Sequence, residues 1–231
     1  MICPRCGTVV SPDAKTCECG FAFVVEKDAD LPAWFDEVRG LLTRAYTLAT
    51  HPWQASGKSG SYEDWVRLRI PVSAVVQRSG SFLDIGCSSG FLLQSLLGWV
   101  RAKGLNIEPH GLDYSPETLT MARQRLPGYA KHLYLGNAWY WYPPQQFDFV
   151  RAELEYVPVN KRPDFIKRLL DEFVAPGGRL LLCHYRSRRE NLESGWVDEY
   201  LCELSYDVLM VESGYSKEGL EQTRVAVLVK E

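Results

Sequence analysis

Short apolar runs alternate with longer amphipathic segments from residue 81 to the end of the chain. Apolar runs bounded by turn residues predict buried strands, and apolar positions at three-and-four spacing predict helices. We expect strands at SFLDIGC, HGLDY, KHLYLGNA, FDFVRAE, RLLLCHY, DVLMVE and RVAVLVKE. Helices are expected over 90–103, from Ser115 onward, across 161–174 and near 194–205. The third of these is expected to be stopped by Ala175-Pro176-Gly177-Gly178. The alternation predicts an α/β fold with a doubly wound, mainly parallel, seven-stranded Rossmann-like sheet.

The segment that precedes this domain has a helical pattern of its own. Over 31–50, apolar residues recur at three-and-four spacing from Trp34 to Leu42, which predicts an amphipathic helix. A loop rich in Gly, Ser and Pro follows, and a second helical segment is expected to break near Pro71. We therefore expect three parts: a small N-terminal module over 1–27, a helical linker or lid over 28–80, and an α/β domain with the ligand site over 81–231.

The composition of the chain argues against several classes of protein. The 231 residues carry a net charge of −3, which argues against a broad basic surface for a nucleic-acid backbone. No apolar run approaches the roughly 20 residues of a membrane span. No secretory signal pattern is present either, so we expect a cytoplasmic protein. In a reducing compartment, Cys87, Cys183 and Cys202 are expected to be buried thiols.

Four cysteines lie close together near the beginning of the chain. The spacing Cys-x-x-Cys-Gly, a turn-rich loop and Cys-x-Cys-Gly is typical of a zinc ribbon. We expect residues 1–27 to form this module around a structural Zn²⁺, whose closed site leaves no position for a substrate. The second knuckle is one residue shorter than usual, and a redox or disulfide role stays an alternative. The predicted ligands are Cys3, Cys6, Cys17 and Cys19.

The first strand of the α/β domain runs into the glycine turn FLDIGCSSGF. Gly86 removes a side chain where a ligand would approach the backbone, and Gly90 lets the start of the following helix pack against the strand. A dinucleotide fingerprint is disfavoured because Ser88 replaces its second glycine. A phosphate-binding loop is disfavoured because no Gly-Lys-Ser/Thr follows. The turn also matches G-x-S-x-G, so a serine hydrolase with His184 stays a remote alternative.

Polar residues follow the next strands at matching positions. Asp84 comes two residues before Gly86, Asp113 ends the second strand, and Asn137 follows the third. Over residues 80–231 this combination resembles the class I S-adenosylmethionine-dependent methyltransferases. The resemblance implies that Asp113 holds the ribose and that Asn137 lies at the edge of the adenine. It implies S-adenosyl-L-methionine as cofactor, bound by Asp84, Gly86, Ser88, Gly90, Asp113, Tyr114, Asn137, Ala138 and Trp139.

The methyl acceptor is expected at the ends of the fourth and fifth strands. There Glu153 or His184 could orient or deprotonate the acceptor, although a purely structural role for each stays open. A small-molecule acceptor fits the negative net charge. The alternative is RNA, because some ribosomal RNA guanine methyltransferases join an N-terminal zinc module to this fold. A third possibility is a non-catalytic scaffold whose ribbon binds a protein partner.

Overall fold

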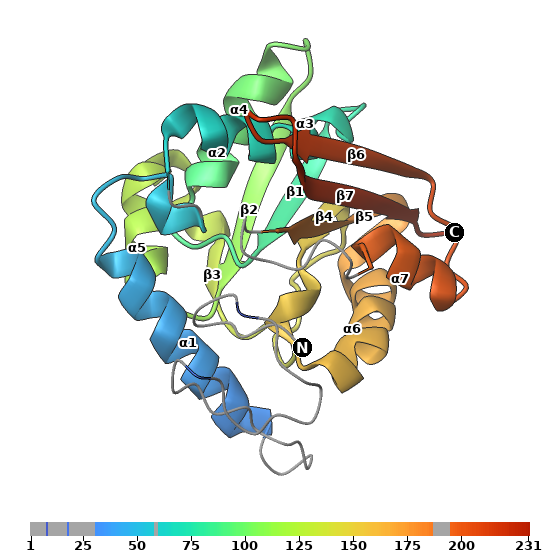
Figure 1. Ribbon diagram of the computed structural model, residues 1–231, viewed down its shortest axis with the longest axis horizontal. Helices are drawn as coiled ribbons and strands as arrows, with labels where there is room; N and C mark the ends of the chain where they lie inside the picture. The colour runs from blue at the N-terminus through green and yellow to red at the C-terminus, as the bar shows by residue number, and fades with distance from the viewer. Residues whose placement is uncertain (1–7, 9–17, 19–30, 58–59, 187–194) are drawn as a thin grey trace.

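The computed structural model describes residues 31–57, 60–186 and 195–231, together with Thr8 and Glu18. The cysteine cluster and the predicted zinc ribbon lie outside these residues. In the described part of the chain, helices and strands alternate around one central sheet (Figure 1).

The sheet contains seven strands in the order β3-β2-β1-β4-β5-β7-β6. β1 to β5 are mutually parallel, whereas β7 runs antiparallel between β5 and β6. This confirms the prediction of a doubly wound, mainly parallel sheet. The strands are β1 (Gly80–Ile85), β2 (Ile107–Asp113), β3 (Leu133–Leu135), β4 (Phe147–Ala152), β5 (Val174–Tyr185), β6 (Met210–Tyr215) and β7 (Glu221–Val229).

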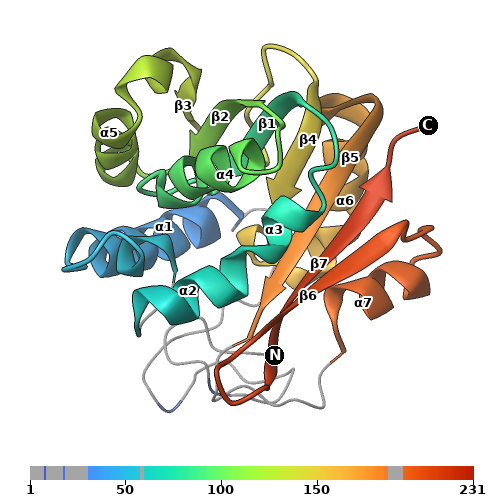
Figure 2. The same cartoon turned by 90° about the horizontal axis from the view of Figure 1, so that it is seen from above.

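Helices cover both faces of the sheet because the strand side chains are apolar on both faces. Figure 2 shows α3 (Pro71–Ala74) and α4 (Phe91–Arg101) in front of the sheet and α6 (Arg162–Arg168) behind it. Leu83 and Ile85 of β1 pack on the α6 side, whereas Phe82 packs on the α4 side. Burying both faces is the usual arrangement of parallel strands. The remaining long helices are α2 (Tyr62–Arg69), α5 (Pro116–Arg125) and α7 (Val197–Glu203).

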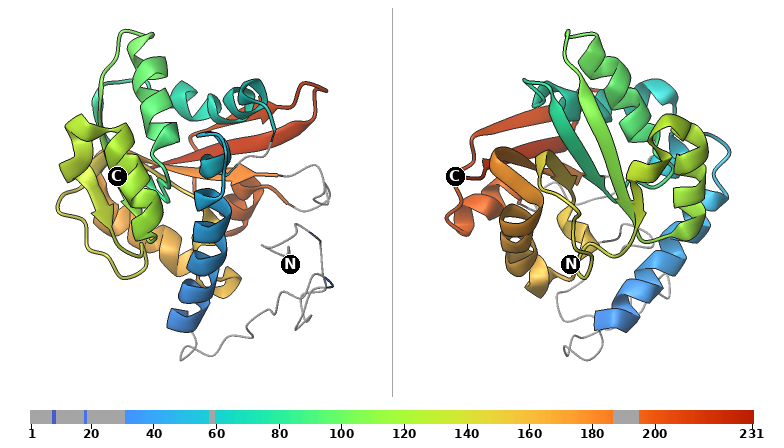
Figure 3. Two further views of the ribbon diagram at one scale, coloured as in Figure 1. Left: turned by 90° about the vertical axis from the view of Figure 1, so that its left-hand side faces the viewer. Right: turned by 180° about the vertical axis from the view of Figure 1, so that it is seen from behind.

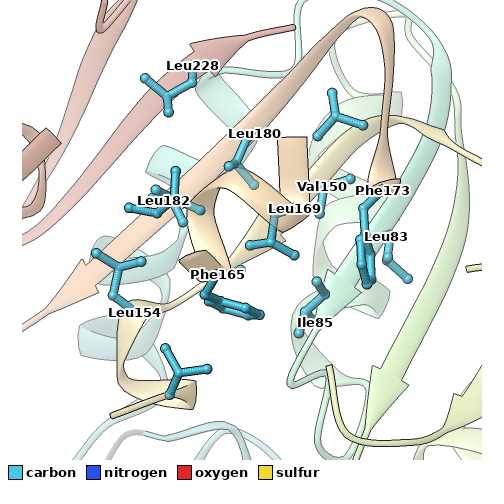
Figure 4. Close-up of a cluster of buried hydrophobic side chains, with 14 of the residues drawn as sticks. Leu83, Ile85, Val150, Leu154, Phe165, Leu169, Phe173, Leu180, Leu182 and Leu228 are labelled. Atoms are coloured by element: carbon cyan, nitrogen blue, oxygen red, sulfur yellow. The ribbon is translucent and has the colours of Figure 1, made fainter. Parts of the chain in front are cut away.

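The core on the α6 side is built from large apolar side chains of the central strands. Figure 4 shows Phe165 and Leu169 pointing toward Leu182 of β5 and Ile85 of β1. These side chains are almost completely removed from water. Burial of each stabilises the fold by roughly 1.5–3 kcal/mol. The core therefore fixes where β1, β4 and β5 end, and these ends carry most of the predicted site.

The predicted N-terminal helix is present as α1 (Leu31–Thr47), and Figure 3 shows it beside α5. Its buried residues are Leu31 and Phe35, while Leu42 of the predicted apolar stripe is 39% exposed. A short 3₁₀ turn, η2 (Gln54–Ser56), precedes α2. The predicted break at Pro71 is confirmed, because α2 ends at Arg69 and α3 begins at Pro71.

Several boundaries differ from the sequence prediction. The segment Ala175-Pro176-Gly177-Gly178 lies inside β5 instead of ending a helix, and the helix before it divides into α6 and a π-helical turn, η6 (Leu169–Phe173). β6 begins at Met210, three residues later than predicted. Cys202 is exposed on α7, so the prediction of a buried thiol was wrong there, whereas Cys87 and Cys183 are buried. None of the helices in the described ranges is both long and apolar enough to span a membrane.

Candidate functional site

The glycine turn after β1 has an unusual backbone. Gly86, Ser88 and Gly90 all have positive φ angles, of 71°, 46° and 72°. Glycine adopts this region without strain, whereas Ser88 is there at some cost. Gly86 and Cys87 donate their backbone N–H groups to the carbonyl of Leu112, which ties the turn to β2. The turn therefore exposes backbone toward the edge of the sheet where β1 and β2 end.

Gly86 is required by its neighbour as well as by its backbone. A Cβ at this position would overlap the hydroxyl and ring of Tyr156, which follows β4. Gly90 lies against α5, where a Cβ would be 3.1 Å from the Cβ of Ala122. Its close packing is therefore against the next helix and not against the strand.

Ser88 connects three parts of the site. Its backbone N–H donates to Asp113 Oδ2 at 2.7 Å, and its hydroxyl donates to the carbonyl of Ala55 in η2 at 2.7 Å. The segment before residue 80 thus lies directly on the glycine turn. Because its hydroxyl binds a backbone carbonyl instead of an imidazole, the arrangement is not that of a hydrolase nucleophile.

Asp113 ends β2 and joins the glycine turn to α5. Besides Ser88, its carboxylate accepts hydrogen bonds from the Ser115 backbone N–H at 2.9 Å and from the Thr118 hydroxyl at 3.0 Å. The backbone of Tyr114 adds a further hydrogen bond, so this carboxylate is held by the turn after β1 and by the start of α5. Burial raises the pKa of Asp113, although these hydrogen bonds oppose the rise.

A buried charge cluster lies under the carboxyl ends of β1 and β4. Arg151 donates to Asp84 Oδ1 at 3.2 Å, to the Ile85 carbonyl at 3.2 Å and to the Tyr156 hydroxyl at 2.9 Å. It also forms a close ion pair with Glu153, which accepts a 3.0 Å hydrogen bond from Tyr156. Asp84 and Arg151 are 1% and 3% exposed. Sequence reasoning selected Asp84 and Glu153 but missed the arginine that joins them.

Burial and charge oppose each other within this cluster. Burial, together with the nearby carboxylates of Glu153 and Asp113, raises the pKa of Asp84 to about 6 against the lowering effect of Arg151. Burial alone would also raise the pKa of Glu153, but Arg151 and Arg69 bring it below its ordinary value. Glu153 therefore stays ionised at neutral pH.

The N-terminal helices add side chains to the site that the sequence analysis did not select. Burial raises the pKa of Tyr46, at the end of α1, to about 12, and the charge of Glu153 adds to this rise. Arg69, at the end of α2, stacks on the ring of Tyr185 with its guanidinium carbon 3.5 Å from the ring centre. No sequence motif identifies these residues, because they reach the site only when α1 and α2 fold over the sheet.

Tyr114 follows Asp113 and contacts α1. Its hydroxyl donates to Asp36 at 2.8 Å, and Arg39 lies 4.7 Å above its ring. Phe35 of α1 meets Tyr140 in an edge-to-face contact with ring centres 5.8 Å apart. Helix α1 therefore covers the ends of β2 and β3, where the sequence analysis expects the adenine.

The loop after β3 is fixed by hydrogen bonds to its backbone. The side-chain oxygen of Asn137 accepts from the Trp139 backbone N–H at 2.8 Å. Arg168 of α6 donates to the carbonyls of Ala138 and Trp141. Some aromatic side chains of this loop pack against the core and others face solvent. The ring centre of Trp141 lies 5.8 Å from that of Phe173 in the core, whereas Tyr142 is 80% exposed.

His184 lies in a separate pocket near the end of β5. The pocket has a volume of about 260 Å³, and Trp196 meets the imidazole edge-to-face at 5.2 Å. Burial, together with the charges of Arg186 and Arg162, lowers the pKa of His184 to about 4. The imidazole is therefore neutral at physiological pH. Other lining residues are Leu154, Glu155, Cys183, Gly195, Val197, Tyr200 and Glu203.

The carboxylates around the glycine turn fit a positively charged ligand that carries hydroxyl groups. The carboxylates of Asp84, Asp113 and Glu153 lie close enough to repel one another. The charges of Asp113 and Glu153 both raise the pKa of Asp84. A positive group bound here would relieve this repulsion. The carboxylate of Asp113, at the end of β2, suits a sugar hydroxyl. S-adenosylmethionine carries a sulfonium, an ammonium and a ribose, so the residues present fit it.

Residues 82–178 match a family model described as "Methyltransferase domain". With the seven-stranded fold, this match identifies a methyltransferase domain in this part of the chain. The serine hydrolase alternative finds no support. A comparison with curated protein sequences gave no match.

Solved structures share this fold at low sequence identity. The 1,6-didemethyltoxoflavin-N1-methyltransferase of Burkholderia thailandensis has 15% identity and a TM-score of 0.62, covering 90% of this chain and 94% of its own. The N-methyltransferase NodS of Bradyrhizobium japonicum WM9 has 17% identity and a TM-score of 0.56, with coverage of 82% and 96%. Magnesium protoporphyrin IX methyltransferase of Synechocystis PCC 6803 has 14% identity and a TM-score of 0.56, covering 90% of this chain and 100% of its own.

Replacing Ser88 with alanine is expected to loosen the N-terminal segment over the site. The variant keeps the Cβ but loses the hydrogen bond to Ala55, which contributes about 1 kcal/mol. We expect the dissociation constant for S-adenosylmethionine to rise about threefold to tenfold by calorimetry. Ser95→Ala is the matched control, because its hydroxyl bonds only within α4. Equal affinities for both variants would show that the Ala55 contact does not support the site.

Proposed function

We propose that this protein transfers a methyl group from S-adenosyl-L-methionine to a small-molecule acceptor bound between the ends of β4 and β5. The observation that supports this most is a pair of contacts at the carboxyl ends of adjacent strands. Asp113 binds the backbone of the glycine turn, and Arg151 binds the Ile85 carbonyl just before the turn and pairs with Asp84 and Glu153. Ligands of doubly wound sheets bind at this edge.

In this proposal the cofactor supplies a methyl group on a positively charged sulfur. Asp113 accepts a hydrogen bond from a ribose hydroxyl, and the backbone at Gly86 lies against the cofactor. Tyr114, Asn137, Ala138 and Trp139 enclose the adenine beneath α1. Ser88 and Gly90 maintain the turn. Asp84, held by Arg151, provides negative charge beside the amino-acid end of the cofactor.

The pocket around His184 supports a small acceptor. Its volume of about 260 Å³ is close to the lower limit of typical small-molecule sites, about 300–1,000 Å³. Trp196 offers an aromatic face, and Arg162 and Glu203 offer polar groups. Two of the similar structures are enzymes named for small molecules, 1,6-didemethyltoxoflavin and magnesium protoporphyrin IX.

We propose different roles for the two candidate catalytic residues. Glu153 is ionised and bonded to Arg151 and Tyr156, so it orients the acceptor or its neighbours and is a poor proton acceptor. His184 is neutral and lines the pocket, so its free nitrogen can accept a hydrogen bond from the N–H or O–H that receives the methyl group.

Replacing His184 with alanine is expected to lower kcat about 100-fold, at the lower end of the contribution typical of a positioned base. Because the pKa of His184 is lowered to about 4, the group is already neutral above pH 5. The wild-type pH profile of kcat should therefore show no limb near pH 6.5, where an ordinary histidine titrates. Glu153→Gln should reduce turnover without changing this profile.

The measurement needs an acceptor, which a screen can supply: formation of S-adenosylhomocysteine is followed with separate small-molecule and RNA fractions. His51→Ala is the matched control, since His51 is exposed and lies outside the pocket. Near-normal turnover in both His184→Ala and Glu153→Gln would contradict the assigned roles. Methyl transfer to RNA alone would contradict a small-molecule acceptor.

The N-terminal module stays a proposal of its own. We propose that residues 1–27 form a zinc ribbon through Cys3, Cys6, Cys17 and Cys19, that 28–80 form a lid, and that 81–231 form the catalytic domain of a cytoplasmic enzyme. If Cys3→Ser/Cys6→Ser removed one zinc ion but left transfer intact, the ribbon would be a stabilising element or a handle for a protein partner. Loss of transfer with cofactor binding retained would make it a substrate reader.

Calorimetry with S-adenosylmethionine and S-adenosylhomocysteine tests the proposed cofactor directly. We expect one binding site per chain for each, with dissociation constants in the micromolar range or tighter. Asp113→Asn should weaken both ligands by about tenfold, which corresponds to about 1.4 kcal/mol. Absence of binding by the folded wild-type protein would overturn the proposal.

A further inference from the structure

Three metal-ligating side chains meet near the beginning of β2, away from the glycine turn. Glu108 and His110 are two residues apart on β2 and therefore point to the same face of the sheet. His132 ends the 3₁₀ helix η3 (Pro127–His132), directly before β3, which Figure 2 shows beside β2. One ligand atom from each residue lies within 4.8 Å of the other two. His110 precedes Asp113 by three residues, about 10 Å along the strand.

His110 is held in place with one nitrogen unused. Its side chain is almost completely buried, and the residue as a whole is 3% exposed. Nδ1 lies 3.2 Å from the Tyr134 hydroxyl, and the ring packs on Phe147 at 4.9 Å. Nε2 is buried and has no hydrogen-bond partner among the described residues; Glu108 Oε1 is 3.7 Å away. A buried polar atom without a partner costs about 1–3 kcal/mol, which binding of a ligand would recover.

His132 presents a second unused nitrogen to the same carboxylate. Its Nδ1 also lacks a hydrogen-bond partner in the described ranges and lies 3.7 Å from Glu108 Oε1. The two imidazole rings are stacked, with centres 4.3 Å apart and planes 7° apart. Burial, with the neighbouring His132, lowers the pKa of His110 to about 4, so this ring is neutral at physiological pH. A neutral imidazole is the form that binds metals.

We propose that Glu108, His110 and His132 form a binding site for a divalent cation of the zinc type. Two imidazole nitrogens and one carboxylate oxygen are a ligand set that suits Zn²⁺ or Co²⁺, with water completing a tetrahedron. Tyr134 fixes the orientation of His110, as outer partners of metal-bound histidines commonly do.

Metal binding requires movement of the two more exposed ligands only. Bonds of about 2.0–2.2 Å to one ion draw the three ligand atoms closer together than they are in the free cluster. The side chains of Glu108 and His132 are 55% and 32% exposed, so they can turn while His110 stays fixed. In particular, the ring of His132 leaves the stack so that its lone pair points at the ion. The ion then ties the short edge strand β3 to β2.

Titration of the full chain with Co²⁺ tests this site without interference from the N-terminal cysteines. Thiolate ligands give near-ultraviolet charge-transfer bands, whereas a site of nitrogen and oxygen gives only visible d–d bands. We expect His132→Gln to bind one fewer ion per chain and to lose the corresponding visible absorption, with the thiolate bands unchanged. His51→Gln, an exposed histidine outside the cluster, is the matched control and should behave as wild type.

Glu108→Gln provides a second test on an exposed side chain whose replacement leaves the core intact. Its dissociation constant for Co²⁺ at this site should rise at least about tenfold. Zn²⁺ should also raise the Tm of the wild-type protein more than that of His132→Gln. Equal stoichiometry, equal visible spectra and equal Zn²⁺-dependent Tm shifts in wild type and both cluster variants would overturn the proposal.

Discussion

Replacing Arg151 with glutamine is expected to lower the free energy of unfolding by about 3–5 kcal/mol at neutral pH. Arg151 is the cation between Asp84 and Glu153, and it also bonds to Tyr156 and to the Ile85 carbonyl. Without it, the buried carboxylates have lost their principal opposite charge. Breaking a buried pair from one side is costly because the remaining charge stays desolvated.

The loss should depend on pH in a direction that identifies its cause. Asp84 already has a pKa raised to about 6 beside Arg151, and removing the cation raises it further. An acid whose pKa is higher in the folded than in the unfolded state favours folding as the pH falls through the folded value. The variant should therefore regain part of the lost stability between pH 7.5 and 5.5. Urea denaturation at both values measures this.

Arg67→Gln is the matched control for charge removal. Arg67 pairs with Asp64 on one helical face, where the two side chains are 40% and 19% exposed. Partly exposed pairs of this kind contribute about 0–1 kcal/mol, so the control should unfold close to wild type. A loss of stability in Arg151→Gln that did not exceed the control, or that increased on acidification, would contradict the assigned role of the cluster.

The order of elements could be predicted from the sequence because the central strands are buried on both faces. The runs around Leu83 and Val150 are short and mostly apolar, and their side chains are buried on both faces of the sheet, which is typical of parallel strands. β3 was less predictable: it is an edge strand of three residues, and His132 belongs to the 3₁₀ helix before it. The glycines of β5 were misread as a stop signal, because the backbone at Gly177 turns locally while the strand pairing continues.

The residues proposed to bind the cofactor could be predicted from the sequence better than the ion pairs between them. Asp84, Asp113 and Asn137 come at strand ends, so their order in the chain already places them at one edge of the sheet. The pairing of Asp84 with Arg151 depends on the register of β1 with β4, across 67 residues of chain. No local pattern contains that register. The same holds for the cluster of Glu108, His110 and His132, in which two residues belong to β2 and the third precedes β3.

Replacing Gly86 with alanine is expected to weaken S-adenosylmethionine binding at least about 100-fold, or about 2.7 kcal/mol. Two effects add. The φ of 71° costs an alanine roughly 1–2 kcal/mol, and its Cβ overlaps Tyr156. Tyr156 cannot move aside freely, because Arg151 and Glu153 hold its hydroxyl at 2.9 and 3.0 Å. The turn has to shift instead, and with it the backbone that faces the cofactor.

Calorimetry on Gly86→Ala is best compared with Gly98→Ala and with Gly86→Ala/Tyr156→Ala. Gly98 lies inside α4 with no atom within 4 Å of an added Cβ, so the control should bind normally and gain about 0.5–1 kcal/mol of stability. In the double variant the overlap is gone and only the backbone cost remains, so part of the affinity should return. If the double variant bound no better than the single one, the turn would be controlled by its backbone alone and not by its contact with Tyr156.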